Sequence, residues 1–418
     1  MPAGQATGRL GTGREVAAPA FPAGVRSTAH QLTTADGAVV AGLLHRLDGA
    51  GGVMAIMHPR QQLAHHPMVA HFLRLGLSVW TQDTRSPNND ISLVHEQALL
   101  DAAAGLVFLR DEGFGPVLVF GHSGGGALYA FYIEQASLPP GRRLTSTPAG
   151  RPVPLAEAEL PAPDGAVFLA PHPGQGAVLL SCIDPSVTDE ADPMSIDPRL
   201  DMFDPANGFA AAGTPSSYAP DFIAGYRAAQ RRRVQRIDAL ASELAAGARA
   251  AREQSAATGD ARERRRALAP RIIITYRTDA DPRYTDPGLE PNDRAYGSLF
   301  GHRPDLTNYG LVGFGRLTTP DSWLSTWSAF SSNAVFTRCA AGIRVPVIYV
   351  EFSGDQAAYP ADADRMFAAL ATPDKHRARV RGQHFGQPLS PGEPTGYQAA
   401  AGQIGPWLSG RFGSEPRP

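Results

Sequence analysis

The apolar residues of this chain fall into short unbroken runs separated by segments of helical spacing. Two extended stretches between residues 25 and 47 flank Asp36-Gly37, a dipeptide that closes tight hairpins. Apolar runs of strand length then recur, at residues 52–57, 77–80, 116–120 and 166–170. Segments of helical spacing follow the first three runs. This alternation predicts an α/β fold, a mostly parallel central sheet with helices on both faces, because the strands of such a sheet are buried on both sides.

The alternation stops near residue 173 and resumes at residue 345. An acidic segment at 184–204, an Arg-rich helix-like segment at 221–269 and a strand-like run at 272–274 lie between these points. The core pattern then continues as a strand, a helix, a polar strand and a closing helix, at residues 345–350, 361–370, 378–380 and 397–408. We therefore expect four parts: a flexible N-terminal tail at 1–24, a first core part at 25–172, an inserted and mainly helical cap at 173–340, and a second core part at 341–418.

Composition and charge exclude several classes of protein. The chain has 43% hydrophobic and 19% charged residues, as soluble proteins do, and no run approaches the ~18 apolar residues of a membrane helix. With 38 basic and 40 acidic residues, the formal charge of −2 attracts neither nucleic acid nor an anionic surface. Cys182 and Cys339 are too far apart for CxxC spacing, which excludes a disulfide framework. The N-terminus lacks a signal-peptide h-region, so we expect a cytoplasmic protein.

The strongest chemical signal is Gly121-His122-Ser123-Gly124-Gly125, which matches G-x-S-x-G. The motif follows an apolar run and precedes an apolar helix at 127–133, the setting in which it has meaning. A sharp strand-to-helix turn strains the serine backbone and requires very small neighbours. The alternative, a phosphate-binding loop, would need Gly-Lys-Ser/Thr, and none follows.

The order of the remaining chemical residues resembles the α/β-hydrolase superfamily, over roughly residues 25–170 and 340–410. In that family a serine is followed by an acid after a late strand and a histidine after the last strand. The resemblance implies Ser123 as nucleophile, His384 as base and Asp355 as the acid that orients it. Rival positions remain open in the sequence, namely Glu351, Asp362 and Asp364 for the acid and His376 for the base.

The resemblance also implies two backbone donors for the oxyanion, one of them the Gly124 amide. The family takes the second donor from the loop after the third strand. Here Pro59 replaces the usual glycine and has no N–H, so we expect the Arg60 amide, or that of Gln61, to serve. The Arg60 side chain is a candidate for binding an acidic group of the substrate, or for pairing with Asp83 or another acid.

Three features of the cap suggest further roles. Trp323, Trp327 and Phe330 have helical spacing near its end, so we predict Trp323 and Trp327 as a substrate-binding wall, with core packing as the alternative. The arginines of the helix-like segment fit a solvated helix face better than a basic binding patch; they are Arg227, Arg231, Arg232, Arg233 and Arg236. The acidic segment lacks the spacing of a calcium loop, and we predict no metal and no other cofactor.

We therefore expect a serine hydrolase that cleaves a carboxylic ester, one with a bulky or aromatic group, through an acyl-enzyme. A thioesterase, an acyltransferase or a C–C bond hydrolase would use the same residues. A serine at the nucleophile position argues against the dehalogenases and epoxide hydrolases of the superfamily, which carry aspartate there. A non-catalytic ligand-binding protein derived from a hydrolase is the alternative of another class. The expected partner is a small-molecule substrate, with no nucleic acid and no membrane; the sequence does not indicate an oligomeric state.

Overall fold

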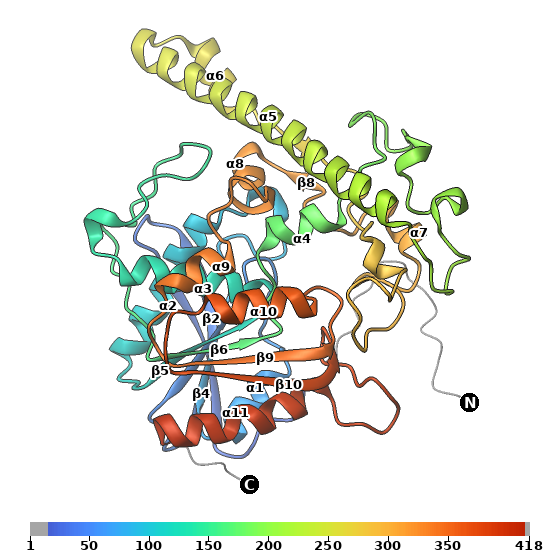
Figure 1. The fold of residues 1–418 in the computed structure, drawn as a ribbon. Coiled ribbons are helices and arrows are strands. Elements are labelled where there is room, and N and C mark those ends of the chain that lie inside the picture. The colour runs from blue at the N-terminus through green and yellow to red at the C-terminus, as the bar shows by residue number, and fades with distance from the viewer. Residues whose placement is uncertain (1–15, 414–418) are drawn as a thin grey trace.

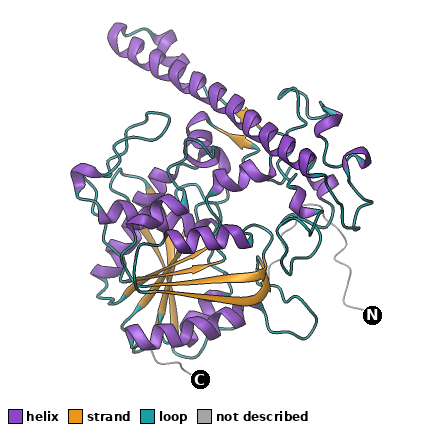
Figure 2. Ribbon diagram, in the orientation of Figure 1, coloured by secondary structure: helices purple, strands orange, loops and turns teal. Residues whose placement is uncertain are grey.

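The computed structural model describes residues 16–413, and its centre is an eight-stranded sheet with the order β1-β2-β4-β3-β5-β6-β9-β10 (Figures 1 and 2). The strands are β1 (Val25–Thr33), β2 (Val39–Leu47), β3 (Val53–Met57), β4 (Ser78–Gln82), β5 (Val117–His122), β6 (Gly165–Leu169), β9 (Val347–Gly354) and β10 (Lys375–Gln383). The β1–β2 and β2–β4 pairs are antiparallel, and every other pair is parallel. The predicted fold class is therefore confirmed. No helix within residues 16–413 combines the length and apolarity needed to cross a membrane.

The sheet opens with the hairpin that Asp36-Gly37 predicts. Gly37 has a φ of +80°, a conformation that glycine adopts without strain. Its amide donates to the carbonyl of Thr34, which closes the turn between β1 and β2. The hairpin places an antiparallel pair at one edge of the sheet, beside the buried inner strands.

Helices cover both faces of the sheet (Figure 1). One face carries α1 (Met68–Arg74) and α11 (Gly396–Phe412), and the other carries α2 (His95–Asp111), α3 (Gly124–Ser137) and α10 (Pro360–Ala369). Every residue of β3, β4, β5 and β6 is buried. Burial on both faces is the reason that β3, β5 and β6 read as apolar runs.

The chain between β6 and β9 holds the elements expected of a mainly helical insertion. They are α4 (Gln175–Cys182), α5 (Pro220–Thr258), α6 (Ala261–Leu268), β7 (Ile273–Ile274), α7 (Pro304–Thr307), β8 (Leu317–Thr318), α8 (Pro320–Ser322), a π-helical turn (Trp323–Trp327) and α9 (Phe336–Cys339). Figure 1 shows α5 crossing the molecule above the sheet, with α6 at its projecting end. The helix-like segment at 221–269 is thus two helices, divided where Gly259 caps the end of α5 and Asp260 caps the start of α6.

The insertion has its own apolar cluster, in which Val234 and Ile237 of α5 pack with Trp323 and Trp327. Its last helix, α9, instead packs into the apolar core between the sheet and the helices α2, α3 and α10. Of the predicted N-terminal tail, residues 16–24 are described and contain no helix or strand, and residues 1–15 lie outside the described part.

Candidate active site

Ser123 stands at a sharp turn between β5 and α3, with φ 53° and ψ −123°. A side chain in this left-handed region is strained and persists only when its surroundings enforce it. A Cβ at Gly121 would lie 2.6 Å from the carbonyl oxygen of Gly125, and a Cβ at Gly125 would lie 2.6 Å from that of Met57. The turn therefore has room only for glycine at these two positions, as the motif predicts.

A continuous line of hydrogen bonds joins Ser123, His384 and Asp355. The Ser123 Oγ lies 2.9 Å from His384 Nε2, and His384 Nδ1 lies 2.9 and 3.0 Å from the two carboxylate oxygens of Asp355. All three residues are buried, with at most 9% of their surface exposed. Because Asp355 accepts at Nδ1, that nitrogen carries the proton and Nε2 is left to accept from the serine. The structure thus brings together the three residues that the sequence selects.

Asp355 is itself held in place by the backbone. Its Oδ1 accepts the amides of Ala357 and Ala358, at 2.7 and 3.0 Å. Its own carbonyl accepts from the side-chain amide of Asn292, at 2.8 Å. These bonds orient the carboxylate toward His384 before any substrate arrives.

The rival positions have other partners. Asp362 caps the first turn of α10. Glu351 and Asp364 form ion pairs with Arg377, at 3.0 and 2.7 Å. His376 is exposed on β10. None of these groups contacts the serine.

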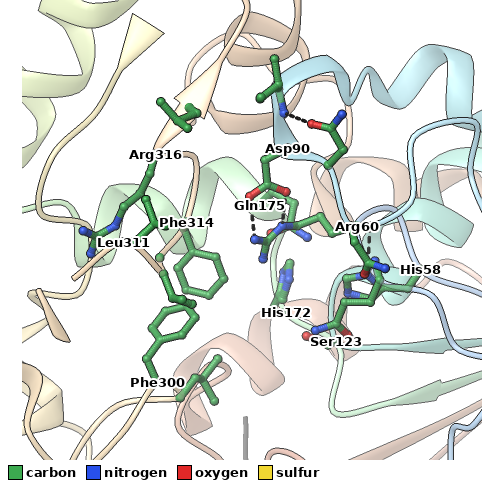
Figure 3. A pocket seen from close by; sticks show the side chains of 18 of the residues that line it. His58, Arg60, Asp90, Ser123, His172, Gln175, Phe300, Leu311, Phe314 and Arg316 are labelled. Carbon is green, nitrogen blue, oxygen red and sulfur yellow. Dashed lines mark hydrogen bonds and ion pairs between the residues drawn. The ribbon is translucent and has the colours of Figure 1, made fainter. Parts of the chain in front are cut away.

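The two amides predicted as the second oxyanion donor already have a hydrogen-bond partner. The amides of Arg60 and Gln61 both donate to Nδ1 of His58, each at 3.0 Å, so neither N–H is free for a substrate oxygen. The Arg60 guanidinium forms two 2.7 Å hydrogen bonds with Asp90, and not with Asp83 (Figure 3). A bidentate carboxylate neutralises the guanidinium, which leaves Arg60 poorly suited to binding an acidic group of the substrate.

The Gly124 amide, the first predicted donor, remains unengaged. Gly124 is the first residue of α3, so its N–H has no carbonyl partner one turn earlier in the helix. The positive end of the helix dipole also lies here and favours negative charge. This amide is therefore suited to bind an oxyanion formed at Ser123.

A cavity of about 530 Å³ opens beside Ser123 (Figure 3). His58, His172 and Gln175 line it on the side of the serine. Its opposite wall comes from the insertion and the His384 loop and is mostly apolar. The apolar side chains are Leu299, Phe300, Leu311, Val312, Phe314 and Phe385, and Arg316 lines the same wall. The cavity therefore pairs a polar floor with a mostly apolar wall.

Trp323 and Trp327 do not line this cavity, which corrects the predicted substrate-binding wall. Both side chains are fully buried. Trp323 Nε1 donates to Asp238 of α5 at 2.7 Å, and the Trp327 ring packs against the Arg60 guanidinium (4.9 Å) and the Phe314 ring (6.2 Å). The π-helical turn directs both rings into the core of the insertion, so Trp327 supports the cavity wall from behind.

His172 and Gln175 are site residues that the sequence analysis missed. The amide of Gly174 donates to His172 Nδ1 at 3.1 Å. Burial, together with the neighbouring His384 and Arg60, lowers the pKa of His172 to about 3. Burial, followed by the charge of Arg60, holds the pKa of His58 well below its usual value. A His-Pro dipeptide shortly after a buried strand was the available signal for both histidines: His58 follows β3 directly, and His172 follows β6 after two residues.

The charged segments of the insertion stabilise its own structure. Six aspartates of the acidic segment each accept the amide two residues further on: Asp184, Asp189, Asp192, Asp197, Asp201 and Asp204. Within residues 16–413 no group of three His, Cys, Asp or Glu is arranged to hold a metal. Arg233 departs from the expected solvated helix face, because its side chain is fully buried and pairs with Glu190 at 2.6 Å.

No protein-family model matches the sequence, and no curated protein matches it. Solved structures match at low identity. They include the esterase Pf2001 of Pyrococcus furiosus (11% identity, TM-score 0.44, covering 96% of this chain and 98% of that chain). The α/β hydrolase GrgF of Penicillium sp. sh18 matches with 14% identity and TM-score 0.48, over 93% and 99% of the two chains. DcsB, solved with its substrate analogue, matches with 13% identity and TM-score 0.49, over 93% and 100%.

The fold follows from the connections of the sheet itself. An antiparallel β1–β2 hairpin edges a parallel sheet, and β3 lies between β4 and β5. Ser123 stands at the carboxyl end of the central β5, and the acid and the histidine follow β9 and β10. This order of strands and chemical residues is that of a nucleophile-elbow hydrolase. The chain therefore has an α/β-hydrolase-like fold, with a mainly helical insertion between β6 and β9.

Proposed function

We propose that this protein is a serine hydrolase that cleaves a carboxylic ester through an acyl-enzyme. The observation that carries the proposal is the hydrogen-bonded line from Ser123 Oγ through His384 to Asp355, with 2.9 Å at each link. A serine hydroxyl needs a base within about 2.6–3.2 Å and a third group to orient that base. The arrangement meets both requirements at the strained turn where a substrate carbonyl can reach Oγ.

The reaction proceeds in two halves. Ser123 Oγ attacks the ester carbonyl while its proton moves to His384 Nε2, and Asp355 stabilises the resulting imidazolium. The Gly124 amide donates to the oxyanion of the tetrahedral intermediate. The intermediate collapses as His384 returns the proton to the leaving alcohol oxygen. Water then attacks the acyl-enzyme by the same steps and releases the acid and free Ser123.

The cavity favours an ester with a bulky apolar group. Its volume of about 530 Å³ falls in the range of small-molecule sites. Phe300 and Phe314 offer ring surface for area burial, and Asp90 already neutralises Arg60. The supported substrate therefore carries a bulky apolar group that packs against these two rings.

Labelling with a fluorophosphonate, combined with hydrolysis of an aryl ester, tests the proposal. Wild-type protein is expected to be labelled at Ser123 and to hydrolyse the ester, and Ser123→Ala to do neither while keeping its fold by circular dichroism. Ser353→Ala is the matched control, because Ser353 is also buried and its hydroxyl has no hydrogen-bond partner among the described residues. Wild-type protein without labelling or turnover would instead support a ligand-binding protein. Parallel assays with a thioester and a diketone separate the related hydrolase reactions.

A further inference from the structure

The three His-Pro dipeptides of the chain share one local geometry. They are His58-Pro59, His66-Pro67 and His172-Pro173. In each, the histidine Nδ1 accepts the amide of the residue after the proline; these amides are those of Arg60, Met68 and Gly174, at 3.0, 3.2 and 3.1 Å. Proline has no N–H of its own, so the next amide closes the turn. Since Nδ1 accepts, the proton of each neutral imidazole resides on Nε2.

The three Nε2–H groups go to different places. That of His66 points to Nδ1 of His122, at 3.1 Å. Those of His58 and His172 have no acceptor among the described residues, and both rings line the cavity beside Ser123 (Figure 3). Two donors of known direction are thus left free at the candidate active site.

The Nε2 atoms of both donors lie close to Gly124. A Cβ built on Gly124 would lie 2.9 Å from His58 Nε2, 3.2 Å from His172 Nε2 and 2.4 Å from Gln175 Nε2. That position is one bond from the Gly124 Cα, and the Gly124 amide belongs to the same residue. The three side-chain nitrogens therefore lie around the Gly124 Cα, beside the amide that is suited to bind the oxyanion.

We propose that His58 and His172 are catalytic residues whose Nε2–H groups bind the oxyanion together with the Gly124 amide, in the role expected of the Arg60 amide. The inference rests on the proposed function. The amides of Arg60 and Gln61 do not reach the oxyanion themselves; they hold the His58 ring so that its far N–H does. Gln175 adds a third side-chain donor beside Gly124.

Burial supports this role, because it keeps both imidazoles neutral. Burial and the charge of Arg60 lower the pKa of both His58 and His172, the latter to about 3. A neutral imidazole donates a hydrogen bond without transferring a proton, and the backbone amides fix its direction in advance. Donors that need no reorganisation are the kind that stabilise a transition state most.

Asparagine variants isolate the far N–H. In His58→Asn and His172→Asn the Asn oxygen replaces Nδ1 as acceptor of the same amide, because asparagine bonds readily to the backbone two residues on. The turn is retained and only the Nε2–H is lost. We expect kcat for an aryl ester to fall about 100- to 1000-fold in His58→Asn, and roughly tenfold or more in His172→Asn, with little change in KM.

A trifluoromethyl ketone provides a second readout. It forms a tetrahedral oxyanion on the serine, so its affinity is expected to weaken in each variant by about the same factor as kcat/KM. His45→Asn is the control, since His45 is a buried histidine of β2 that does not line the cavity; it is expected to behave as wild type. Equal losses of kcat and ketone affinity would not arise from a merely structural role.

Two results would overturn the inference and leave the proposed function standing. One is that both Asn variants hydrolyse the ester at the wild-type rate. The other is a ¹⁵N–¹H imidazole spectrum in which His58 or His172 is protonated at Nδ1 and not at Nε2, measured on Ser123→Ala protein so that turnover has no influence. Absence of wild-type turnover would overturn the proposed function, and the inference with it.

Discussion

His66 donates a hydrogen bond from Nε2 to Nδ1 of His122, at 3.1 Å. His122 is the residue before the candidate nucleophile, and its Nε2 lies 3.0 Å from the carbonyl oxygen of His384. The first ring is held in turn by the amide of Met68 at the start of α1. One line of hydrogen bonds therefore runs from α1 to the backbone of the candidate base.

Removing His122 should weaken both the fold and the site. His122→Phe leaves the His66 N–H and the His384 carbonyl buried without partners, and each such loss costs about 1–3 kcal/mol. We expect the free energy of unfolding, measured in urea, to fall by about 2–5 kcal/mol, and kcat to fall because the His384 loop is less constrained. His66→Asn breaks one link and keeps the turn to Met68, so its loss should be smaller. Equal stability of all three proteins would contradict this.

Asp355→Asn should lower kcat by about 10⁴-fold, because an amide favours the wrong His384 tautomer. Asp362→Asn is a matched control, since Asp362 caps α10 and pairs with Arg365 at 2.6 Å without contacting His384. We expect its kcat to stay within about twofold of wild type and its stability to fall by about 1 kcal/mol. Steady-state kinetics on one aryl ester compares them; a larger kcat loss in Asp362→Asn would assign the acid to that residue instead.

Truncation of the cavity wall should change substrate preference, and truncation of Trp323 in the core of the insertion should not. Phe314→Ala is expected to reduce the kcat/KM advantage of bulky over acetate esters by about 10- to 200-fold, the effect of roughly 1–3 kcal/mol of pocket contact. Trp323→Ala removes a fully buried ring and should lower the free energy of unfolding by about 3–5 kcal/mol. An ester series and urea denaturation on both variants distinguish the roles. Unaltered preference in Phe314→Ala would exclude this wall from substrate selection.

Acid should destabilise the fold through His95. Burial lowers the pKa of His95 to about 4, against 6.5 as the ordinary value, and neither ring nitrogen has a partner among the described residues. Between pH 4 and pH 6.5, His95 takes up a proton only in the unfolded chain. The contribution of His95 is therefore fully present above pH 6.5 and is lost toward pH 4, by up to about 1.4 kcal/mol per pH unit.

His95→Phe tests this contribution. It should raise the free energy of unfolding at pH 7 by about 1–3 kcal/mol, because two buried polar atoms no longer lack partners. It should also make the decline between pH 6.5 and pH 4 shallower, which urea denaturation at a series of pH values measures. A slope equal to that of wild type would show that another group governs the acid response.

The sequence by itself determined the sheet and the order of its chemistry. Strands buried on both faces must be apolar throughout, so β3, β5 and β6 were visible as runs without any structure. The serine turn was equally visible, because Gly121 and Gly125 are required by backbone atoms only a few residues away or on the adjacent strand. Ser123, Asp355 and His384 could be chosen because their order along the chain resembles that of the α/β-hydrolase superfamily.

Only the tertiary structure decided which groups surround the substrate. Helical spacing showed that Trp323 and Trp327 share a face, but whether that face meets the cavity or α5 depends on packing between segments distant in sequence. The hydrogen-bond partner of the Arg60 amide could not be predicted from the sequence either. Pro59 showed that one N–H was missing, and yet the direction of the next amide toward His58 depends on backbone angles that spacing does not carry. The cavity joins His58 to His172, 114 positions later in the chain, because the carboxyl ends of β3 and β6 lie on the same edge of the sheet.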